Sequence, residues 1–259
     1  MKDEIDYVEG IQFDRGYISP YFSTDTKTSK CEYDNPLIMI VDGKVSQVQH
    51  VLPVLEAAHT SNRSLVIIAN DVEGEALGML ILNKLRGSSR VVAVKAPSFG
   101  ENQKQQLIDL AVLTNAQVIS DDPNQISNLT QFEPENLGTC KKVSISKDET
   151  ILLGCSGSEE SIQTRCEQIR NAIEDPTTTD YEKEKLRERL AKILNSVAVI
   201  KVGGNSDVEM NERKDRFEDA LHATRAAIAD GIVPGGGSAL LYATHTLSKV
   251  RAKMQNQEQ

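Results

Sequence analysis

The sequence of 259 residues lacks a long hydrophobic run. No apolar stretch approaches the ~20 residues that a helix needs to span a bilayer. The first ten residues, MKDEIDYVEG, contain neither the apolar core of a signal peptide nor an Arg-rich amphipathic pattern. These absences predict that the chain has no membrane partner. The length is enough for one large domain, alone or with an appendage.

Basic residues are scarce relative to acidic ones. The chain has 29 Lys and Arg residues against 38 Asp and Glu residues, which gives a formal net charge of −9. No part of the sequence forms a basic stripe that could meet the phosphates of a nucleic acid. We therefore expect no nucleic-acid partner.

Cysteine and histidine are few and widely spaced: Cys31, Cys140, Cys155 and Cys166, with His50, His59, His222 and His245. The cysteines show no C-x-x-C spacing, so neither a zinc site nor a redox motif is indicated. Free thiols in a reducing compartment are the expected state. The histidines form no ligand cluster, and the sequence predicts no metal site.

Common catalytic motifs are also missing. The sequence has no G-x-S-x-G, no Walker P-loop and no G-x-G-x-x-G after its first apolar strand. A glycine run from Gly235 to Gly237 could bring backbone N–H groups close to a phosphate near a helix start. A plain turn explains that run equally well.

Aromatic residues make up only 4% of the chain, yet Tyr17, Tyr21 and Phe22 crowd together in EGIQFDRGYISPYF, from Glu9 to Phe22. Pro20 fixes its own φ and drives Ser19 toward extended geometry, so we expect a braced extended segment. The rings of Tyr17, Tyr21 and Phe22 could fill a hydrophobic core or face a partner. Their spacing alone leaves both interpretations open.

Apolar runs then alternate with helical patterns. Strands are predicted at Leu37 to Val41, Leu65 to Ala69 and Val91 to Val94, and helices at about Val51 to His59, Glu73 to Arg86 and Glu101 to Leu113. This βαβαβα order implies an α/β fold with a largely parallel sheet flanked by helices.

The second half of the chain predicts smaller elements. They are a polar loop from about Asp121 to Gly138, a hairpin through Lys147-Asp148, two charged helices at about Glu159 to Glu174 and Tyr181 to Asn195, a strand from Val197 to Val202, and a long helix from about Val208 to Asp230. The two charged helices are typical of a solvated pair.

Two of the predicted helices carry more apolar surface than packing on a sheet requires. In Glu73 to Arg86, for which Asp71 is the expected N-cap, apolar residues surround the helix axis. In the preceding helix, Pro53 belongs in the first turn and indicates a start near Val51. We expect an exposed apolar groove between these helices that suits a segment of another protein. The alternative is that a loop of the same chain covers it.

Five segments, in the same order along the chain, resemble the apical domain of group I chaperonins (the GroEL type). They are the aromatic segment, DVEGEAL from Asp71, VKAP ending at Pro97, YEKEKLRERLAK from Tyr181 and DALHATRAA from Asp219. The resemblance implies the apical-domain fold, in which a largely parallel sheet flanked by helices carries a β-hairpin, a helical pair and an appended helical segment of the intermediate domain.

The resemblance also implies domain boundaries. Residues 1–8 would be a linker from the intermediate domain, 9–196 the apical substrate-binding domain, 197–230 the C-terminal half of the intermediate domain, and 231–259 the start of the equatorial domain and a tail. Because the family continues upstream of this point, Met1 before KDEIDYVEG suggests an excised piece. Such a piece is expected to be a monomer.

A binding function follows from the same resemblance. In group I chaperonins, non-native polypeptides and the mobile loop of the co-chaperonin bind between the two apical helices and beside the aromatic segment, and other chaperonin subunits complete a ring. Carried onto this sequence, the contacts fall on Tyr17, Ser19, Tyr21, Phe22, Leu52, Leu55, Leu77, Ile81, Leu82 and Asn83.

ATP and magnesium belong, by this resemblance, to the full-length protein. The catalytic aspartate of the family matches Asp219, and its glycine run would touch the nucleotide through Gly236. The resemblance places the rest of that site in an equatorial half that precedes this segment. We therefore expect that this chain needs no cofactor, does not bind ATP tightly and does not hydrolyse it.

Some residues depart from the family pattern. Ser98 stands where glycine is usual, and Asn115-Ala116 replaces a Gly-Gly pair, so the local turn geometry is in doubt. KCEY at Cys31, VGGNSDVEMNE and IVPGGG are closer to mitochondrial members. They indicate the mitochondrial matrix, with the bacterial cytoplasm or another organelle as the alternative.

Two functions of other classes remain open. An α/β enzyme domain would bind a small ligand at the carboxyl ends of the strands. It needs a phosphate loop or convergent polar residues there, and the sequence indicates neither. A purely structural piece of an oligomer would have its groove filled by its own chain or by a fixed partner.

Overall fold

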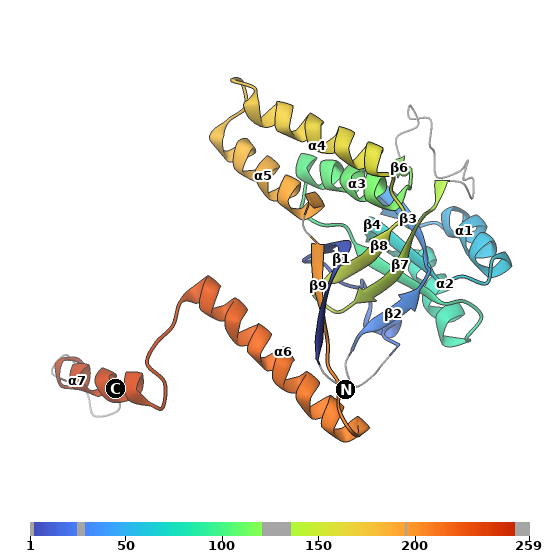
Figure 1. Cartoon of the computed structure of the whole chain (residues 1–259). Helices are drawn as coiled ribbons and strands as arrows, with labels where there is room; N and C mark the ends of the chain where they lie inside the picture. Colours follow the sequence, from blue (N-terminus) through green and yellow to red (C-terminus); the bar gives the residue numbers. More distant parts are fainter. Residues whose placement is uncertain (1–2, 25–28, 121–135, 195, 252–259) are drawn as a thin grey trace. The chain divides into compact units, whose positions relative to one another are not determined.

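The computed structural model of the chain describes residues 3–24, 29–120, 136–194 and 196–251 (Figure 1). The polar loop predicted from Asp121 to Gly138 falls mostly on residues 121–135, which lie outside the described part. The chain divides into two compact units, residues 6–199 and residues 1–5 with 200–259. None of the helices within the described ranges is both long and apolar enough to cross a membrane.

The larger unit contains the α/β layer that the apolar runs predict. Its parallel strands are β3 (Leu37–Val45), β4 (Leu65–Val72), β5 (Val91–Lys95) and β6 (Val118–Ser120). The connecting helices are α1 (Val48–Thr60), α2 (Gly74–Leu85) and α3 (Glu101–Thr114). Figure 1 shows α1 and α2 on one side of these strands and α3 on the other. Because both faces are covered, every residue from Leu65 to Ala69 is buried.

The sheet continues with antiparallel strands on the other side of β3. They are β7 (Gly138–Ile145), β8 (Thr150–Cys155), β1 (Glu4–Phe13) and β2 (Cys31–Asp34). The strand order is β5-β4-β3-β7-β8-β1-β9, with β9 at Ser196–Lys201, while β2 pairs with β7. The hairpin predicted through Lys147-Asp148 is confirmed. The sheet is parallel where it carries α1 and α2, and its pairs β3–β7, β7–β8, β8–β1 and β2–β7 are antiparallel.

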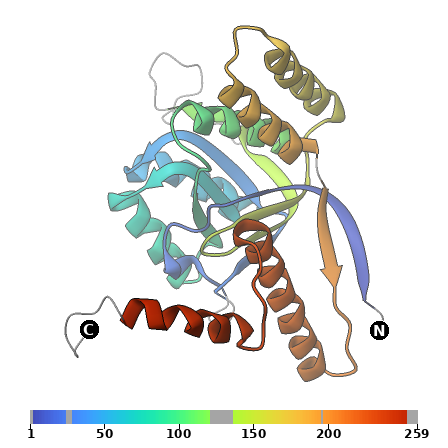
Figure 2. The same ribbon diagram turned by 90° about the vertical axis from the view of Figure 1, so that its left-hand side faces the viewer.

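The predicted helical pair consists of α4 (Glu159–Glu174) and α5 (Asp180–Leu194). Both helices pack on α3, as the two views of Figures 1 and 2 show. Ser158 caps α4 by accepting a hydrogen bond from the Ser161 amide. Thr179 and Glu182 form a reciprocal capping box at the start of α5, since each side chain accepts the backbone N–H of the other.

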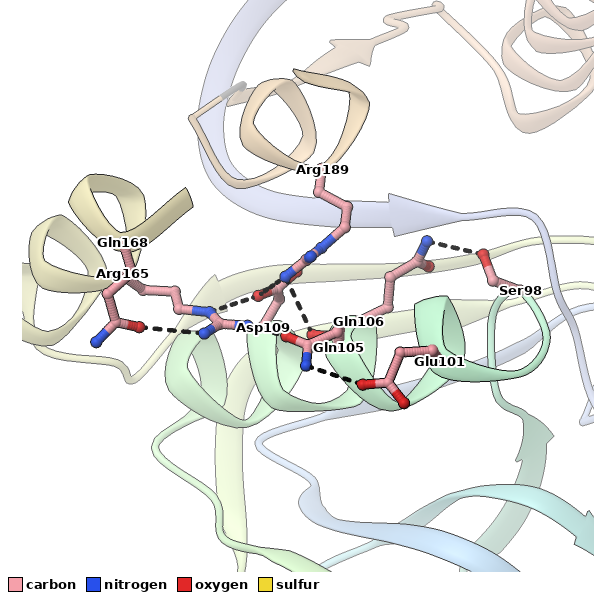
Figure 3. A network of polar contacts seen from close by, with 8 residues as sticks. All are labelled: Ser98, Glu101, Gln105, Gln106, Asp109, Arg165, Gln168 and Arg189. Atoms are coloured by element: carbon pink, nitrogen blue, oxygen red, sulfur yellow. Dashed lines mark hydrogen bonds and ion pairs between the residues drawn. The ribbon is translucent and has the colours of Figure 1, made fainter. Parts of the chain in front are cut away.

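A buried carboxylate joins this helical pair to α3 (Figure 3). Both oxygens of Asp109 accept hydrogen bonds from Arg189, at 2.8 and 2.9 Å, and one of them also accepts from Arg165 Nε at 2.8 Å. Arg165 further donates to Gln105 Oε1 at 3.0 Å. The prediction of a solvated pair was therefore incomplete, because Arg189 is almost fully buried between the helices.

One predicted helix start and one predicted N-cap were wrong. α1 begins at Val48 rather than near Val51, so Pro53 lies beyond the first turn. The N-cap of α2 is Glu73, not Asp71. Because β4 remains paired with β3 as far as Val72, Asp71 is held in the strand, and its carboxylate accepts the Val72 N–H at 3.0 Å.

Two positions at which the family usually has glycine have a left-handed backbone in this chain. Ser98 has φ 61° and Asn115, the C-cap of α3, has φ 56°. The hydroxyl of Ser98 accepts from Gln106 Nε2 at 2.7 Å, and its carbonyl accepts from Gln103 Nε2 at 3.0 Å. Side chains of α3 thus stabilise a turn for which glycine would be less strained.

The smaller unit is mainly helical. α6 (Asp207–Asp230) is capped by Ser206, whose hydroxyl accepts the Glu209 N–H at 3.2 Å, and the predicted long helix is confirmed. The glycine run lies immediately before α7 (Ser238–Arg251). No described residue of α6 is buried.

Candidate functional site

The outer face of α2 is the most apolar exposed helix surface of the larger unit. Only Ala76 and Leu80 of this helix are buried. Leu77, Met79 and Ile81 pack partly against the core, while Leu82 remains 53% exposed. A helix with apolar residues all round would bury most of them in a closed core. Here a row of them stays open to solvent.

α1 lies against α2 and adds to this face. Its inner side, formed by Val51, Val54, Leu55 and Ala58, is buried. Leu52 points away from that side and is 41% exposed. α1 therefore has one core face and one exposed leucine.

The second half of the aromatic segment, Gly16 to Phe22, runs along the edge of β5. The Ile18 N–H donates to Ala93 O at 2.8 Å, and the Lys95 N–H donates to Gly16 O at 3.2 Å. A Cβ on Gly16 would lie 2.0 Å from Ser146 O, so only glycine permits this approach. The segment then ends in a 3₁₀ turn from Pro20 to Phe22, rather than staying extended as predicted.

Lys84 of α2 connects that turn to the sheet. Its ammonium donates to the carbonyl of Phe22 and to the hydroxyl of Tyr33, the latter at 2.9 Å, and lies 3.8 Å from Cys31 Sγ. Burial lowers the pKa of Lys84, although Cys31 opposes the shift. Burial also raises the pKa of the Cys31 thiol and of the Tyr33 hydroxyl. One half-buried cation thus contacts a carbonyl of the 3₁₀ turn and both a phenol and a thiol of β2.

The structure brings most of the predicted contact residues onto one continuous face, because α2 contacts both α1 and the 3₁₀ turn. We name this the α1–α2 face and define it by Tyr17, Ser19, Tyr21, Leu52, Leu77, Ile81, Leu82 and Asn83, all of which are exposed or partly exposed. Tyr21 is the most exposed of them, at 63%.

Two predicted contact residues lie in the core instead. Phe22 is fully buried, and Leu55 is 5% exposed. Consecutive side chains of a 3₁₀ turn point about 120° apart, so Phe22 faces the core while Tyr21 faces solvent. Leu55 follows Val51 on the inner side of α1. As placed here, these two side chains support the α1–α2 face from beneath and offer no surface to a partner.

A polar hollow of about 550 Å³ was missed by sequence reasoning. It lies where β4 and β5 end, and its charged lining residues are Asp14, Arg15, Asp71, Lys95, Lys147 and Asp148. Lys95 and Asp71 pair across it at 3.8 Å. The order of the apolar strands could have indicated this place. Its lining contains no Ser, Cys or His that could form a nucleophile–base pair.

Comparison with known families decides the class of the protein. The sequence model of the TCP-1/cpn60 chaperonin family matches residues 2–259. The chain belongs to that family. The expected resemblance to chaperonins is thereby confirmed.

Individual relatives agree with this assignment. This chaperonin chain is 55% identical over 251 residues to "Chaperonin CPN60-1, mitochondrial" of Zea mays, a match that covers 97% of the chain and 43% of the relative. It is 52% identical over 264 residues to "Heat shock protein 60, mitochondrial" of Candida albicans, covering 100% and 45%. It is 56% identical over 243 residues to the protein of the same name from Ajellomyces capsulatus, covering 94% and 41%.

The lengths and the names of these relatives bear on the chaperonin chain in two ways. It spans less than half of the length of the curated relatives it matches. All three relatives are named as mitochondrial, which confirms the expected mitochondrial assignment.

The two residues that the family resemblance assigns to ATP are both exposed in the chaperonin chain. Asp219 is exposed on α6, and Gly236, at φ 64°, is exposed before α7 with nothing near its Cβ position. Within the described ranges, no group of three or more His, Cys, Asp or Glu residues could hold a metal ion.

Proposed function

We propose that this chain is the polypeptide-binding part of a ring chaperonin, and that it captures non-native proteins and the mobile loop of a co-chaperonin on the α1–α2 face. The observation that carries the proposal is the exposure of Leu52, Leu82 and Tyr21 on adjacent elements. A folded monomer seldom leaves such side chains together without a partner.

The chemistry of the face suits a partner without a fixed sequence. Burial of one exposed leucine side chain contributes about 1.5–3 kcal/mol and needs little directional matching. Non-native chains expose the apolar segments that folded proteins hide, so affinity for such segments selects the unfolded state. Asn83 and Ser19 add hydrogen-bonding groups at the rim of the face, which suits the backbone of an extended segment.

The support beneath the face fits the same role. The buried side chains of Phe22 and Leu55, together with the half-buried Lys84, hold the turn and the two helices in place. A promiscuous surface on a rigid base avoids the entropic cost of ordering the receptor on each binding event.

In the full-length protein, we propose that other subunits complete a ring and that ATP with magnesium, bound in the rest of the protein, drives the release of the bound chain. Residues 9–196 would form the apical substrate-binding domain, residues 1–8 and 197–230 would belong to the intermediate domain, and residues 231–259 would begin the equatorial domain. The present chain would not hydrolyse ATP by itself, and measurable turnover by purified material would overturn that part of the proposal.

A fluorescence-anisotropy titration of a labelled co-chaperonin mobile-loop peptide tests the binding proposal. The variants are Leu82→Ser and the double variant Leu52→Ser, Leu82→Ser. The matched control is Leu194→Ser, because Leu194 on α5 is also 53% exposed but lies on another helix. We expect saturable binding, weakened about tenfold by Leu82→Ser and further by the double change. Equal weakening by Leu194→Ser, or no binding to a folded wild-type chain, would overturn the proposal.

A further inference from the structure

Two of the four cysteines lie directly opposite each other in the antiparallel sheet. Cys140 of β7 and Cys155 of β8 are register partners. The neighbouring Ser156 N–H donates to Thr139 O at 3.3 Å. This bond joins the residue after Cys155 to the residue before Cys140, which is the pattern that flanks a non-hydrogen-bonded pair.

That position determines how close the two residues are. In a non-hydrogen-bonded antiparallel pair the Cα atoms are about 4.5 Å apart, and the side chains are closer than in the hydrogen-bonded kind. Disulfides need Cα atoms at roughly 4.4–6.8 Å. The spacing of regular pairs of this kind therefore falls within the disulfide range.

We propose that Cys140 and Cys155 form a reversible cross-strand disulfide when the chain meets an oxidising small-molecule disulfide. Both are free thiols in this structure. The remaining cysteines have no such partner: Cys31 of β2 stands opposite Ile145, and Cys166 lies on α4. The site is thus specific to one pair, and it is independent of the α1–α2 face.

Access determines which thiol reacts first. Cys155 lines a hollow of about 280 Å³ whose other lining residues include Gly10, Leu113, Gly157 and Ile162. Cys140 is 3% exposed. Burial raises the pKa of Cys155 to about 11 and that of Cys140 to about 12, with Cys155 adding to the latter. Both thiols are therefore protonated and unreactive near neutral pH. The rate of oxidation should increase as the pH rises, because more thiolate forms.

The reaction balances with a small-molecule disulfide such as oxidised glutathione as the oxidant. The Cys155 thiol loses its proton to solvent, its sulfur attacks the glutathione disulfide, and one glutathione leaves as a thiolate that takes up a proton. The Cys140 thiolate then attacks the Cys155 sulfur of the mixed disulfide, and the second glutathione leaves. Two protein thiols are oxidised, and one glutathione disulfide is reduced to two thiols.

The experiment uses the whole chain at pH 8.5, equilibrated with mixtures of reduced and oxidised glutathione and quenched with acid. We expect the intact mass to fall by two hydrogen atoms, the titratable thiols in denaturant to fall from four to two, and a proteolytic map to link residue 140 to residue 155. A 16-residue closed segment should also raise the Tm by about 5 °C or more.

Variants separate this pair from other thiol chemistry. The double variant Cys31→Ser, Cys166→Ser should oxidise like the wild type, whereas Cys140→Ala and Cys155→Ala should not lose the two hydrogens. The proteolytic map of the oxidised wild-type chain identifies the disulfide directly. The test therefore does not depend on whether a variant folds. A glutathione adduct on Cys155 that never closes, a link that includes Cys31 or Cys166, or four unchanged thiols at the most oxidising mixture would each overturn the proposal.

Discussion

Arg189 of α5 holds both carboxylate oxygens of Asp109 on α3, through hydrogen bonds of 2.8 and 2.9 Å in a nearly water-free site. Arg165 of α4 completes the site on one oxygen. Two guanidinium groups thus share one buried carboxylate (Figure 3), and the docking of the helical pair on α3 depends on it.

Replacement of Asp109 by Ala should destabilise the chain by about 3–5 kcal/mol, because it leaves two guanidinium groups without their counter-charge in a buried site. Urea unfolding followed by circular dichroism measures the change. The control is Glu188→Ala, which removes the exposed Lys185–Glu188 pair on α5 and should cost less than about 1 kcal/mol. Similar losses for the two variants would show that the buried site contributes no more than a surface pair.

Lys84→Met should loosen the 3₁₀ turn, since the carbonyl of Phe22 and the hydroxyl of Tyr33 both lose the ammonium that donates to them. We expect a loss of about 1–3 kcal/mol in stability and faster amide exchange at Phe22 and Ser23. Lys44→Met is the control, because Lys44 and its partner Glu73 are both largely exposed. Unchanged exchange at the turn in Lys84→Met would contradict the role assigned to this lysine.

Two glycine substitutions should change the stability of the chain in opposite directions. Gly16→Ala would place a Cβ 2.0 Å from Ser146 O and should displace the aromatic segment from β5, at a cost of several kcal/mol. Gly78→Ala meets nothing within 4 Å in the middle of α2 and should stabilise the chain by about 0.5–1 kcal/mol. Thermal unfolding of the two variants compares them directly. A stable Gly16→Ala variant with unchanged exchange at Ile18 would refute the close approach.

Alkaline pH should destabilise the reduced chain through its buried thiols. Cys140 and Cys155 have pKa values of about 12 and about 11 in the folded state, against an ordinary value of 9.0. A raised folded pKa means that the unfolded state releases the proton first, so the stabilising effect is complete below pH 9 and is lost as the pH rises toward 11–12.

The slope of that loss approaches about 1.4 kcal/mol per pH unit for each thiol that is ionised only in the unfolded state. Urea midpoints between pH 8 and 10.5, with a phosphine reductant present, measure it. Cys140→Ala should flatten the slope relative to wild type. Cys31→Ser retains the contributions of Cys140 and Cys155 and loses only that of Cys31, whose pKa is also raised by burial. An identical slope in wild type and Cys140→Ala would rule out the buried thiol as its source.

Much of the fold could be predicted from local sequence. Continuous apolar runs identified β3, β4 and β5, because strands covered on both faces need no polar side. Periodic charge patterns identified α4 and α5 to within a few residues. The errors fell at helix starts, where the pairing of β4 as far as Val72 overrode the capping preference of Asp71.

The candidate face was predictable in composition but not in detail. The sequence alone determined that α1 and α2 carry surplus apolar residues and that rings crowd between Tyr17 and Phe22. Only the tertiary structure decided that Tyr21 faces solvent while Phe22 fills the core, and that Arg189 is buried beside Asp109. It also placed Cys140 opposite Cys155. The physical reason is that the propensity of a segment depends on its own residues, whereas burial and pairing depend on which distant segments pack against it.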